Sequence, residues 1–214
     1  GMHTVLGAIP AIVHPAPREV AIIGLGSGDT AWAVGCRGAA TERVTVFEIS
    51  GPNLGLLERL WERGAAPPTL AGFLADPRVR HVVADGRNSL ENAREPVDVI
   101  EIDALWPSNA YSENLYSVEF FELCSRRLAP GGLMCSWCPT ERVRHSFREA
   151  RCALEATGPP NGAAPPVASY RDLGAFTQHG GGLGLQFDQL ADRLARLALG
   201  LFLQEAAEQD EGDD

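Results

Sequence analysis

Val20-Ala21-Ile22-Ile23-Gly24-Leu25-Gly26-Ser27-Gly28-Asp29 is the stretch that decides the fold, because a short apolar run is followed at once by three closely spaced glycines. The apolar run is typical of a buried strand. The glycines allow the backbone to approach a ligand and to turn into a helix that we expect at residues 29–36. A dinucleotide fingerprint would place its third glycine at position 29, which is Asp29, whereas the third glycine here is Gly28. The spacing therefore favours a methyltransferase-type nucleoside pocket over an NAD pocket.

Strand and helix patterns alternate from this stretch to about residue 155. We expect further strands at residues 44–47, 79–83, 97–102 and 132–137, with helices around 54–60, 69–75 and 117–128. Residues 167–170 and 183–187 are weaker strand candidates. Nearly continuous apolar strands separated by helices are typical of a parallel sheet covered on both faces. The sequence thus predicts an α/β, Rossmann-like methyltransferase fold, with a mostly parallel, doubly wound sheet of about seven strands and helices on both faces.

Four segments make up the predicted domain organisation. They are an N-terminal segment (1–17), a Rossmann-like nucleoside-binding domain (18–187), a C-terminal helix (188–204) and an acidic tail (205–214). Leucines at 190, 194, 197 and 201 give the C-terminal helix its apolar stripe. The tail holds six acidic residues, so the rest of the chain carries only −4 of the net charge of −10. We expect the tail to be disordered and solubilising.

Composition excludes several classes of function. The chain contains no lysine, since all 18 of its basic residues are arginine. A Schiff base to pyridoxal phosphate, a P-loop lysine and a lysine general base are therefore excluded. The acidic balance and the lack of a basic stripe argue against nucleic-acid binding. The five histidines have no metal-ligand spacing, and we expect the five cysteines to be reduced and mostly buried.

The beginning of the chain and its apolar runs bear on localisation. The start, Gly1-Met2-His3, lacks the pattern of an export signal, in which a basic n-region is followed by an apolar region. The longest apolar runs are far too short to cross a bilayer. We therefore expect a cytoplasmic protein with no membrane partner.

Acidic residues end three of the predicted strands. Glu48 follows the second strand about twenty residues beyond the glycine loop, where a carboxylate can accept hydrogen bonds from both ribose hydroxyls. Asp85 with Gly86 ends the third strand, and Asp103 ends the fourth. Ligands of open α/β sheets bind outside the carboxyl ends of the strands, so these residues should share one edge. The predicted cofactor-binding residues are Gly24, Gly26, Gly28, Glu48, Asp85, Gly86 and Asp103.

Several motifs in order resemble the spermidine synthase, or polyamine aminopropyltransferase, family. They lie between His14 and Pro139, and they are the glycine loop, His14-Pro15-Ala16-Pro17-Arg18, Asp76-Pro77-Arg78-Val79, Asp85-Gly86-Arg87, Leu115-Tyr116-Ser117-Val118-Glu119-Phe120-Phe121 and Leu128-Ala129-Pro130-Gly131-Gly132. The resemblance implies a transferase that binds S-adenosylmethionine or its decarboxylated form. It also implies that Glu48 contacts the ribose, that Asp85 and Gly86 lie at the adenine, and that a small molecule such as a polyamine is the partner. A homodimer is a further expectation by analogy.

The sequence departs from that family at two positions. The fourth strand leads into Asp103-Ala104-Leu105-Trp106-Pro107, where the family has Asp-x-x-Asp-Pro. Asp103 matches the first of these two aspartates. Trp106 stands in place of the second, which the resemblance implies is the general base, and tryptophan cannot accept a proton. Ser27 stands where the family has an aspartate that holds the cofactor's amino group. The motifs that the resemblance assigns to nucleoside binding are intact. The general base that it assigns to aminopropyl transfer onto a polyamine is missing.

Other side chains near the fourth strand are candidates for a catalytic role. Asp103 and Tyr116 are the predicted catalytic residues, and Tyr111 and Glu113 lie in the same loop. Glu101 shares a strand face with Asp103, and we expect it to be buried and paired. Three interpretations stay open: a spermidine-synthase-like transferase, an S-adenosylmethionine-dependent methyltransferase, and a non-catalytic nucleoside-binding or assembly module.

Overall fold

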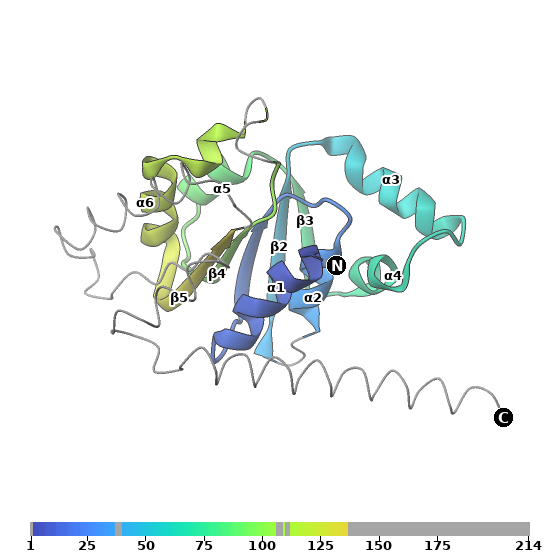
Figure 1. Ribbon diagram of the computed structural model, residues 1–214, viewed down its shortest axis with the longest axis horizontal. Helices are drawn as coiled ribbons and strands as arrows, with labels where there is room; N and C mark the ends of the chain where they lie inside the picture. The colour runs from blue at the N-terminus through green and yellow to red at the C-terminus, as the bar shows by residue number, and fades with distance from the viewer. Residues whose placement is uncertain (1, 37–39, 106–108, 110–111, 137–214) are drawn as a thin grey trace. The chain divides into compact units, whose positions relative to one another are not determined.

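A five-stranded parallel sheet forms the centre of the protein (Figure 1). The computed structural model describes residues 2–36, 40–105, 109 and 112–136. Its strands are β1 (Glu19–Ile23), β2 (Arg43–Glu48), β3 (Val79–Val83), β4 (Val97–Ile102) and β5 (Leu128–Ser136). The predicted α/β class and parallel sheet are confirmed for these strands, while the strands expected at 167–170 and 183–187 lie outside the described residues.

The strand order β3-β2-β1-β4-β5 makes β1 the centre of the sheet. The chain moves outward on one side from β1 to β3, then crosses to the other side of β1 for β4 and β5. All four neighbouring pairs are parallel. The point where the strand order reverses is where open α/β sheets bind their ligands, at the carboxyl ends of the strands. This topology places the glycine loop after β1 at that point.

The helices predicted within the described residues are present within three residues of their expected bounds. They are α2 (Asp29–Gly35), α3 (Gly51–Glu62), α4 (Pro68–Ala75) and α6 (Val118–Arg127), and a 3₁₀ turn, η2, covers Glu113–Tyr116. Helix α5 (Gly86–Glu91) was not predicted, because six residues are too few to show a helical period. Its signal was the capping residue Asp85, whose side chain accepts from the Asn88 amide.

The fifth strand begins earlier than its apolar pattern indicates. It was predicted from residue 132, but β5 starts at Leu128 and pairs there with Val97, whereas the next pair is Val99 with Leu133. The intervening residues form an irregularity in the ladder that includes Gly131, with φ of +81°. A Pro-Gly-Gly sequence is therefore a bulge within the strand, although it is equally typical of a turn.

The N-terminal segment forms a helix, α1 (Met2–Val13), that sequence analysis did not predict. Gly7 and Pro10 within it are residues that normally interrupt helices. Gly7 is required here because a Cβ atom would lie 2.2 Å from the Thr30 carbonyl oxygen of α2. Leu6 and Ile9 are buried, so α1 packs as part of the domain.

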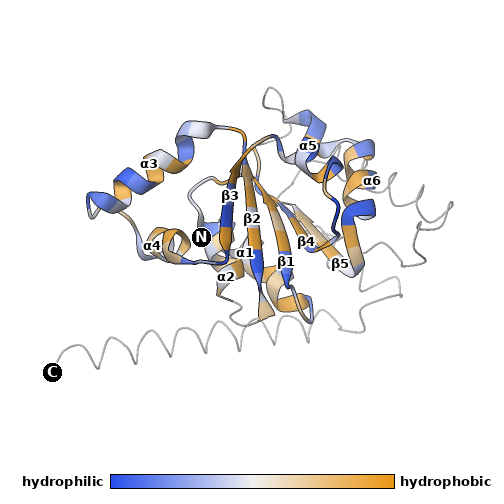
Figure 2. Ribbon diagram, turned by 180° about the vertical axis from the view of Figure 1, so that it is seen from behind, coloured by the Kyte–Doolittle hydropathy of each residue, from blue (hydrophilic) through white to orange (hydrophobic). Residues whose placement is uncertain are grey.

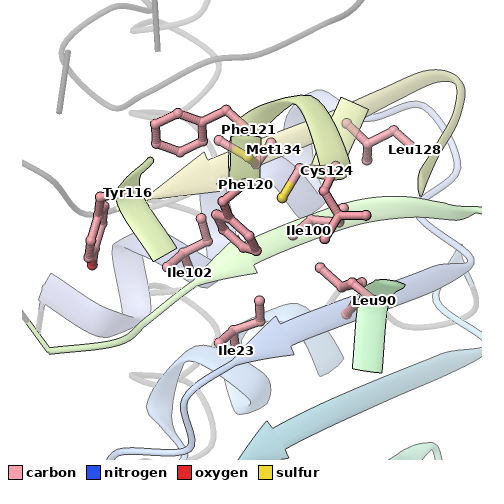
Figure 3. Packing of buried hydrophobic residues seen from close by; sticks show 12 residues of the cluster. Ile23, Leu90, Ile100, Ile102, Tyr116, Phe120, Phe121, Cys124, Leu128 and Met134 are labelled. Carbon is pink, nitrogen blue, oxygen red and sulfur yellow. The ribbon is translucent and has the colours of Figure 1, made fainter. Parts of the chain in front are cut away.

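Two apolar clusters cover opposite faces of the sheet. The cluster in Figure 3 joins alternate residues of β1, β4 and β5 to α5 and α6, with Phe120 and Phe121 at its centre. The other cluster joins the remaining face of β1, β2 and β4 to α2, α3 and α4, through residues such as Ile22 and Phe73. In Figure 2 the central strands β1 and β2 are mainly apolar, whereas the edge strand β3 is mixed. This doubly covered sheet leaves its carboxyl edge for the site.

Gly24 sits where the first strand leaves the sheet, and its replacement tests how tightly the site is packed. Its φ is +98°, and a Cβ atom there would lie 2.2 Å from the Asp103 carbonyl oxygen. Gly64 also has a positive φ, +66°, but nothing lies within 4 Å of its Cβ position. We expect Gly24→Ala to lower the free energy of unfolding by about 2–5 kcal/mol, and Gly64→Ala by about 1–2 kcal/mol, because only the former adds a backbone clash to the strain. Urea denaturation measures both, and equal losses would contradict the packing described.

Candidate functional site

Two backbone hydrogen bonds fix the position of the glycine loop. The Gly24 amide donates to the Phe47 carbonyl of β2 (2.8 Å), and the Asp103 amide donates to the Ile23 carbonyl of β1 (2.8 Å). The chain therefore leaves β1 while tied to the ends of both neighbouring strands. As a consequence, Glu48 and Asp103 lie on opposite sides of the loop.

The glycines of this loop adopt conformations that side chains disfavour. Gly24, Gly26 and Gly28 all have positive φ, at +98°, +51° and +85°. A Cβ atom on Gly28 would lie 2.9 Å from the Phe73 ring of α4. The loop therefore packs closely between the end of β4 and helix α4. Helix α2 begins directly after its last glycine, Gly28.

Glu48 faces the glycine loop, as its place at the end of β2 predicts. Its Oε2 accepts a hydrogen bond from the Leu25 amide (2.9 Å), and its Oε1 accepts one from the Ser50 amide (2.7 Å). The residue is only 8% exposed. Two amides thus fix the carboxylate, yet each carboxylate oxygen retains a second lone-pair site. Those sites could accept the hydroxyls of a ribose.

Asp85 and Gly86 lie at the start of α5, beyond the end of β3. The Asp85 Oδ1 atom accepts from the Asn88 amide (2.7 Å), so this side chain caps the helix. Gly86 is buried, and a Cβ atom on it would lie 2.7 Å from the Ile23 side chain. Both residues therefore have a structural reason to be present. Their predicted role at an adenine stays a prediction.

Asp103 is the centre of a hydrogen-bonded group that spans three elements. Its Oδ1 lies 2.8 Å from His3 Nδ1 on α1, and its Oδ2 accepts from the Thr30 hydroxyl of α2 (2.6 Å). The Asp103 side chain is 7% exposed, whereas that of His3 is 51% exposed. Sequence analysis found Asp103 but missed both partners, because no local pattern signals a contact across 100 residues.

Glu101 is buried on the same face of β4 as Asp103. Its side chain is completely buried, and neither carboxylate oxygen has a hydrogen-bond partner among the described residues. We expected burial with a partner, so the expected partner is absent from the described part of the chain. Loss of hydration and, to a lesser extent, the nearby charge of Asp103 raise the pKa of Glu101 well above its ordinary value. Folding therefore favours the protonated, neutral form of Glu101.

Tyr116 is a packed aromatic residue as well as a neighbour of the site. It is 4% exposed within the cluster of Figure 3, and its hydroxyl donates to the Leu105 carbonyl (3.1 Å). This bond links η2 to the loop that follows β4. Its predicted catalytic role stays a prediction. Trp106 and Tyr111 lie outside the described residues, and Glu113 is exposed.

Three exposed apolar side chains stand at the carboxyl ends of strands, two on the adjacent strands β2 and β3 and one after β4, on the other side of β1. Ile49 follows β2, Val83 ends β3, and Leu105 follows β4, with exposed fractions of 74%, 58% and 63%. A single exposed apolar side chain is ordinary, but Ile49 and Val83 are exposed on adjacent strands, at the same edge of the sheet as the polar loop. Such a combination suits a ligand with a flat apolar part and a polar part.

Three further features of the described residues concern free thiols, metal binding and membrane-spanning helices. Cys124 and Cys135 are buried free thiols whose pKa values are raised by burial, and Cys36 is an exposed free thiol. Within residues 2–36, 40–105 and 112–136, no group of three or more His, Cys, Asp or Glu side chains is placed to bind a metal. No helix in the part of the chain that the structure describes is long and apolar enough to cross a membrane.

Known proteins resemble this chain in both sequence and fold. The family model of the spermine/spermidine synthase domain matches residues 1–145 of the 214. A polyamine aminopropyltransferase of Nitrosomonas europaea is 31% identical over 62% of this chain, and one of Pseudomonas aeruginosa is 32% identical over 62%. Those matches cover 38% and 44% of the two relatives, so the matched region is less than half of their length.

The fold likeness extends further than the sequence likeness. The crystal structure of spermidine synthase from Thermotoga maritima has a TM-score of 0.59, at 21% identity over 94% of this chain and 74% of that one. A spermidine synthase in complex with the transition-state analogue AdoDATO has a TM-score of 0.63, at 21% identity over 94% of this chain and 75% of that one. The chain belongs to the spermine/spermidine synthase family. The predicted α/β fold and the resemblance to this family are thus confirmed.

The buried Glu101 predicts an unusual dependence of stability on pH. A carboxyl group whose pKa is raised by folding retains its proton when the unfolded chain has lost it, so stability falls as pH rises above the ordinary value of 4.5. We expect the free energy of unfolding of Glu101→Gln to rise relative to that of the native chain as the pH increases. The difference should grow by up to about 1.4 kcal/mol per pH unit until Glu101 ionises in the folded state. Denaturant titrations between pH 4 and 9 measure this difference.

Glu42→Gln is the matched control, because Glu42 is an exposed glutamate that pairs with Arg18. It directly precedes β2, at the end of that strand away from the site. Its stability difference from the native chain should change by less than about 1 kcal/mol over the same pH range. A pH-independent difference for Glu101→Gln would show that Glu101 is ionised or finds a partner in the folded protein.

Proposed function

We propose that this chain is a transferase that binds the nucleoside of decarboxylated S-adenosylmethionine and moves its aminopropyl group to an amine. The observation that carries the proposal is the contact between Glu48 and the Leu25 amide, because it holds a carboxylate against the glycine loop at the switch point of the sheet. This is the arrangement expected of a nucleoside site in an open α/β sheet.

The residues around the loop suit the parts of that nucleoside. Glu48 is positioned to accept hydrogen bonds from the ribose hydroxyls through its remaining lone pairs. Ile49 and Val83 offer exposed apolar surface for the adenine, at the ends of adjacent strands. The family resemblance assigns Asp85 and Gly86 to the same end of the ligand. The site thus provides polar contacts for the sugar and apolar contacts for the base.

The charges at this edge favour a cationic donor. Glu48, Asp85 and Asp103 all stand at the carboxyl ends of the strands. A donor that carries a positive sulfonium and a positive amino group is attracted to such an edge. The additional carboxylate of S-adenosylmethionine would be repelled there, so the decarboxylated form is the preferred donor. When bound, that donor supplies an electrophilic carbon attached to a positively charged sulfur.

The acceptor is proposed on the likeness to the family. The relatives from N. europaea and P. aeruginosa are named polyamine aminopropyltransferases, which supports a polyamine or similar amine as the acceptor. The replacement of the family's second acid by Trp106 bears on this acceptor half and leaves the nucleoside half unaffected. Asp103 and the Tyr116 loop remain the proposed neighbours of the reacting atoms.

Calorimetric titration with methylthioadenosine, S-adenosylmethionine and its decarboxylated form tests the proposal. We expect the decarboxylated form to bind more tightly than S-adenosylmethionine. Glu48→Gln should weaken methylthioadenosine binding by about 10-fold or more, because hydrogen bonds to a charged group contribute about 1.5–3 kcal/mol. Glu42→Gln, at the opposite end of β2, should leave that affinity unchanged.

The other outcomes point to specific alternatives. Tighter binding of S-adenosylmethionine would contradict aminopropyl transfer and favour a methyltransferase. Failure of all three compounds to bind the native chain would overturn the proposal and favour a non-catalytic module.

A further inference from the structure

We propose that Arg87 is a positioning residue, which holds the η2 turn (Glu113–Tyr116) at a fixed distance from the start of α5. The start of α5 carries Asp85 and Gly86, which are assigned to the adenine, and η2 carries Tyr116, a proposed neighbour of the reacting atoms. Arg87 thus keeps the nucleoside end of the site in register with its acceptor end. The effect on catalysis rests on the proposed function, whereas the effect on η2 rests on the chain's own contacts.

The guanidinium of Arg87 joins segments that are 27 and 30 residues away in the chain. Its Nη1 atom donates to the Asn114 carbonyl oxygen of η2 (2.7 Å), which is a charge-assisted hydrogen bond. The same atom lies 3.4 Å from the Oγ atom of Ser117, the residue that ends η2 and begins α6. Helices α5 and α6 are neighbours in Figures 1 and 2, and Arg87 connects the beginnings of the two.

An aromatic ring fixes the place of this guanidinium. The Cζ atom of Arg87 lies over the Phe120 ring, 5.8 Å from its centroid, which is within the range of a cation–π contact. Phe120 is fully buried in the apolar cluster of Figure 3, so its ring is a rigid platform. A planar guanidinium can stack on a ring and donate hydrogen bonds at the same time, whereas the ammonium of lysine is a compact point charge. The pair of contacts therefore requires arginine.

Ser117 carries the effect of Arg87 into the beginning of α6. Its Oγ atom accepts from the Phe120 amide (3.3 Å) and so caps this helix. The pKa of the Glu119 carboxyl group is lowered by its own backbone amide, by the Ser117 side chain and, to a smaller extent, by Arg87. A cation, a capping hydroxyl and an anion thus support one another where η2 passes into α6.

Both segments that Arg87 joins are anchored to the sheet. Gly86 is buried at the end of β1, where a Cβ atom would lie 2.7 Å from the Ile23 side chain. Tyr116 is buried as well, and its hydroxyl donates to the Leu105 carbonyl after β4 (3.1 Å). The Arg87 contacts lie between these two anchors. They therefore set the spacing between the start of α5 and η2.

Hydrogen exchange of the full chain, measured by mass spectrometry without any ligand, tests the structural part. We expect Arg87→Met to speed the exchange of residues 113–117 by about 10-fold or more, because a hydrogen bond from a charged group shifts a local opening equilibrium by at least that factor. Exchange of β1 should stay unchanged, which shows that the variant is folded. Unchanged exchange of residues 113–117 in Arg87→Met would overturn the proposal.

Two further variants separate positioning from general stability. Arg94→Met is the matched control, because Arg94 is an exposed arginine between α5 and β4, and it should alter neither region. Arg87→Lys keeps the charge and loses the planar fork, so it should speed the exchange of residues 113–117 by a smaller factor than Arg87→Met. If both Arg87 variants speed the exchange of β1 as much as that of η2, Arg87 supports the whole fold and the proposal fails.

A double-mutant cycle with Tyr116→Phe tests the role in catalysis. Arg87→Met should lower the turnover number for aminopropyl transfer by about 10-fold or more, because slight misplacement of groups around reacting atoms slows a reaction. It should leave the dissociation constant of methylthioadenosine within about twofold, and Arg87→Lys should restore part of the turnover. If Arg87 acts through η2, the double variant should lose less than the product of the two single losses.

The kinetic outcomes that contradict the proposal are specific. Undiminished turnover in Arg87→Met, or a loss in the double variant equal to the product of the single losses, would overturn the role of Arg87 in catalysis. Absence of nucleoside binding or of turnover in the native chain would instead overturn the proposed function. The exchange result would then still decide whether Arg87 holds η2.

Discussion

The hydrogen bonds that tie the end of β1 to both of its neighbours are the constraint on which the site depends. The Gly24 amide reaches the Phe47 carbonyl, and the Asp103 amide reaches the Ile23 carbonyl, so three strand ends are fixed together. Only a glycine fits at position 24, because the Asp103 carbonyl occupies the space of a side chain. The loop that follows must then pass between an acid from β2 and an acid from β4. The geometry of the site is thus a consequence of backbone bonding.

Sequence alone was sufficient for the parts of the site that depend on topology. Once a parallel sheet was predicted, the carboxyl ends of its strands had to share one edge, so Glu48 and Asp103 could be placed near the glycine loop before any contact was known. The apolar runs were short and bounded by turn residues, which made most strand positions reliable. The errors lie where local signals conflict, as in β5, whose bulge at Gly131 has the sequence of a turn.

The contacts that could not be predicted are those between elements far apart in the chain. Gly7 and Pro10 are poor helix residues, yet α1 forms because Gly7 lets it approach the backbone of α2. Packing in this case outweighs propensity, as it often does in folded domains. The same approach brings His3 to Asp103. A residue that sequence analysis would leave in an uncharacterised segment therefore becomes part of the site.

β4 shows how the chain combines stability with the requirements of the site. Its face toward α1 and α2 carries two acids, Glu101 and Asp103, two residues apart. An apolar side chain at position 101 would pack there without the cost of removing a carboxyl group from water. If both acids were charged they would repel each other, and His3 could compensate only one of them. Burial reduces this conflict, because it raises the pKa of Glu101 and so favours the protonated form of that carboxyl group. A buried acid that lowers stability at neutral pH is typical of a functional region, where local rules yield to the needs of the site.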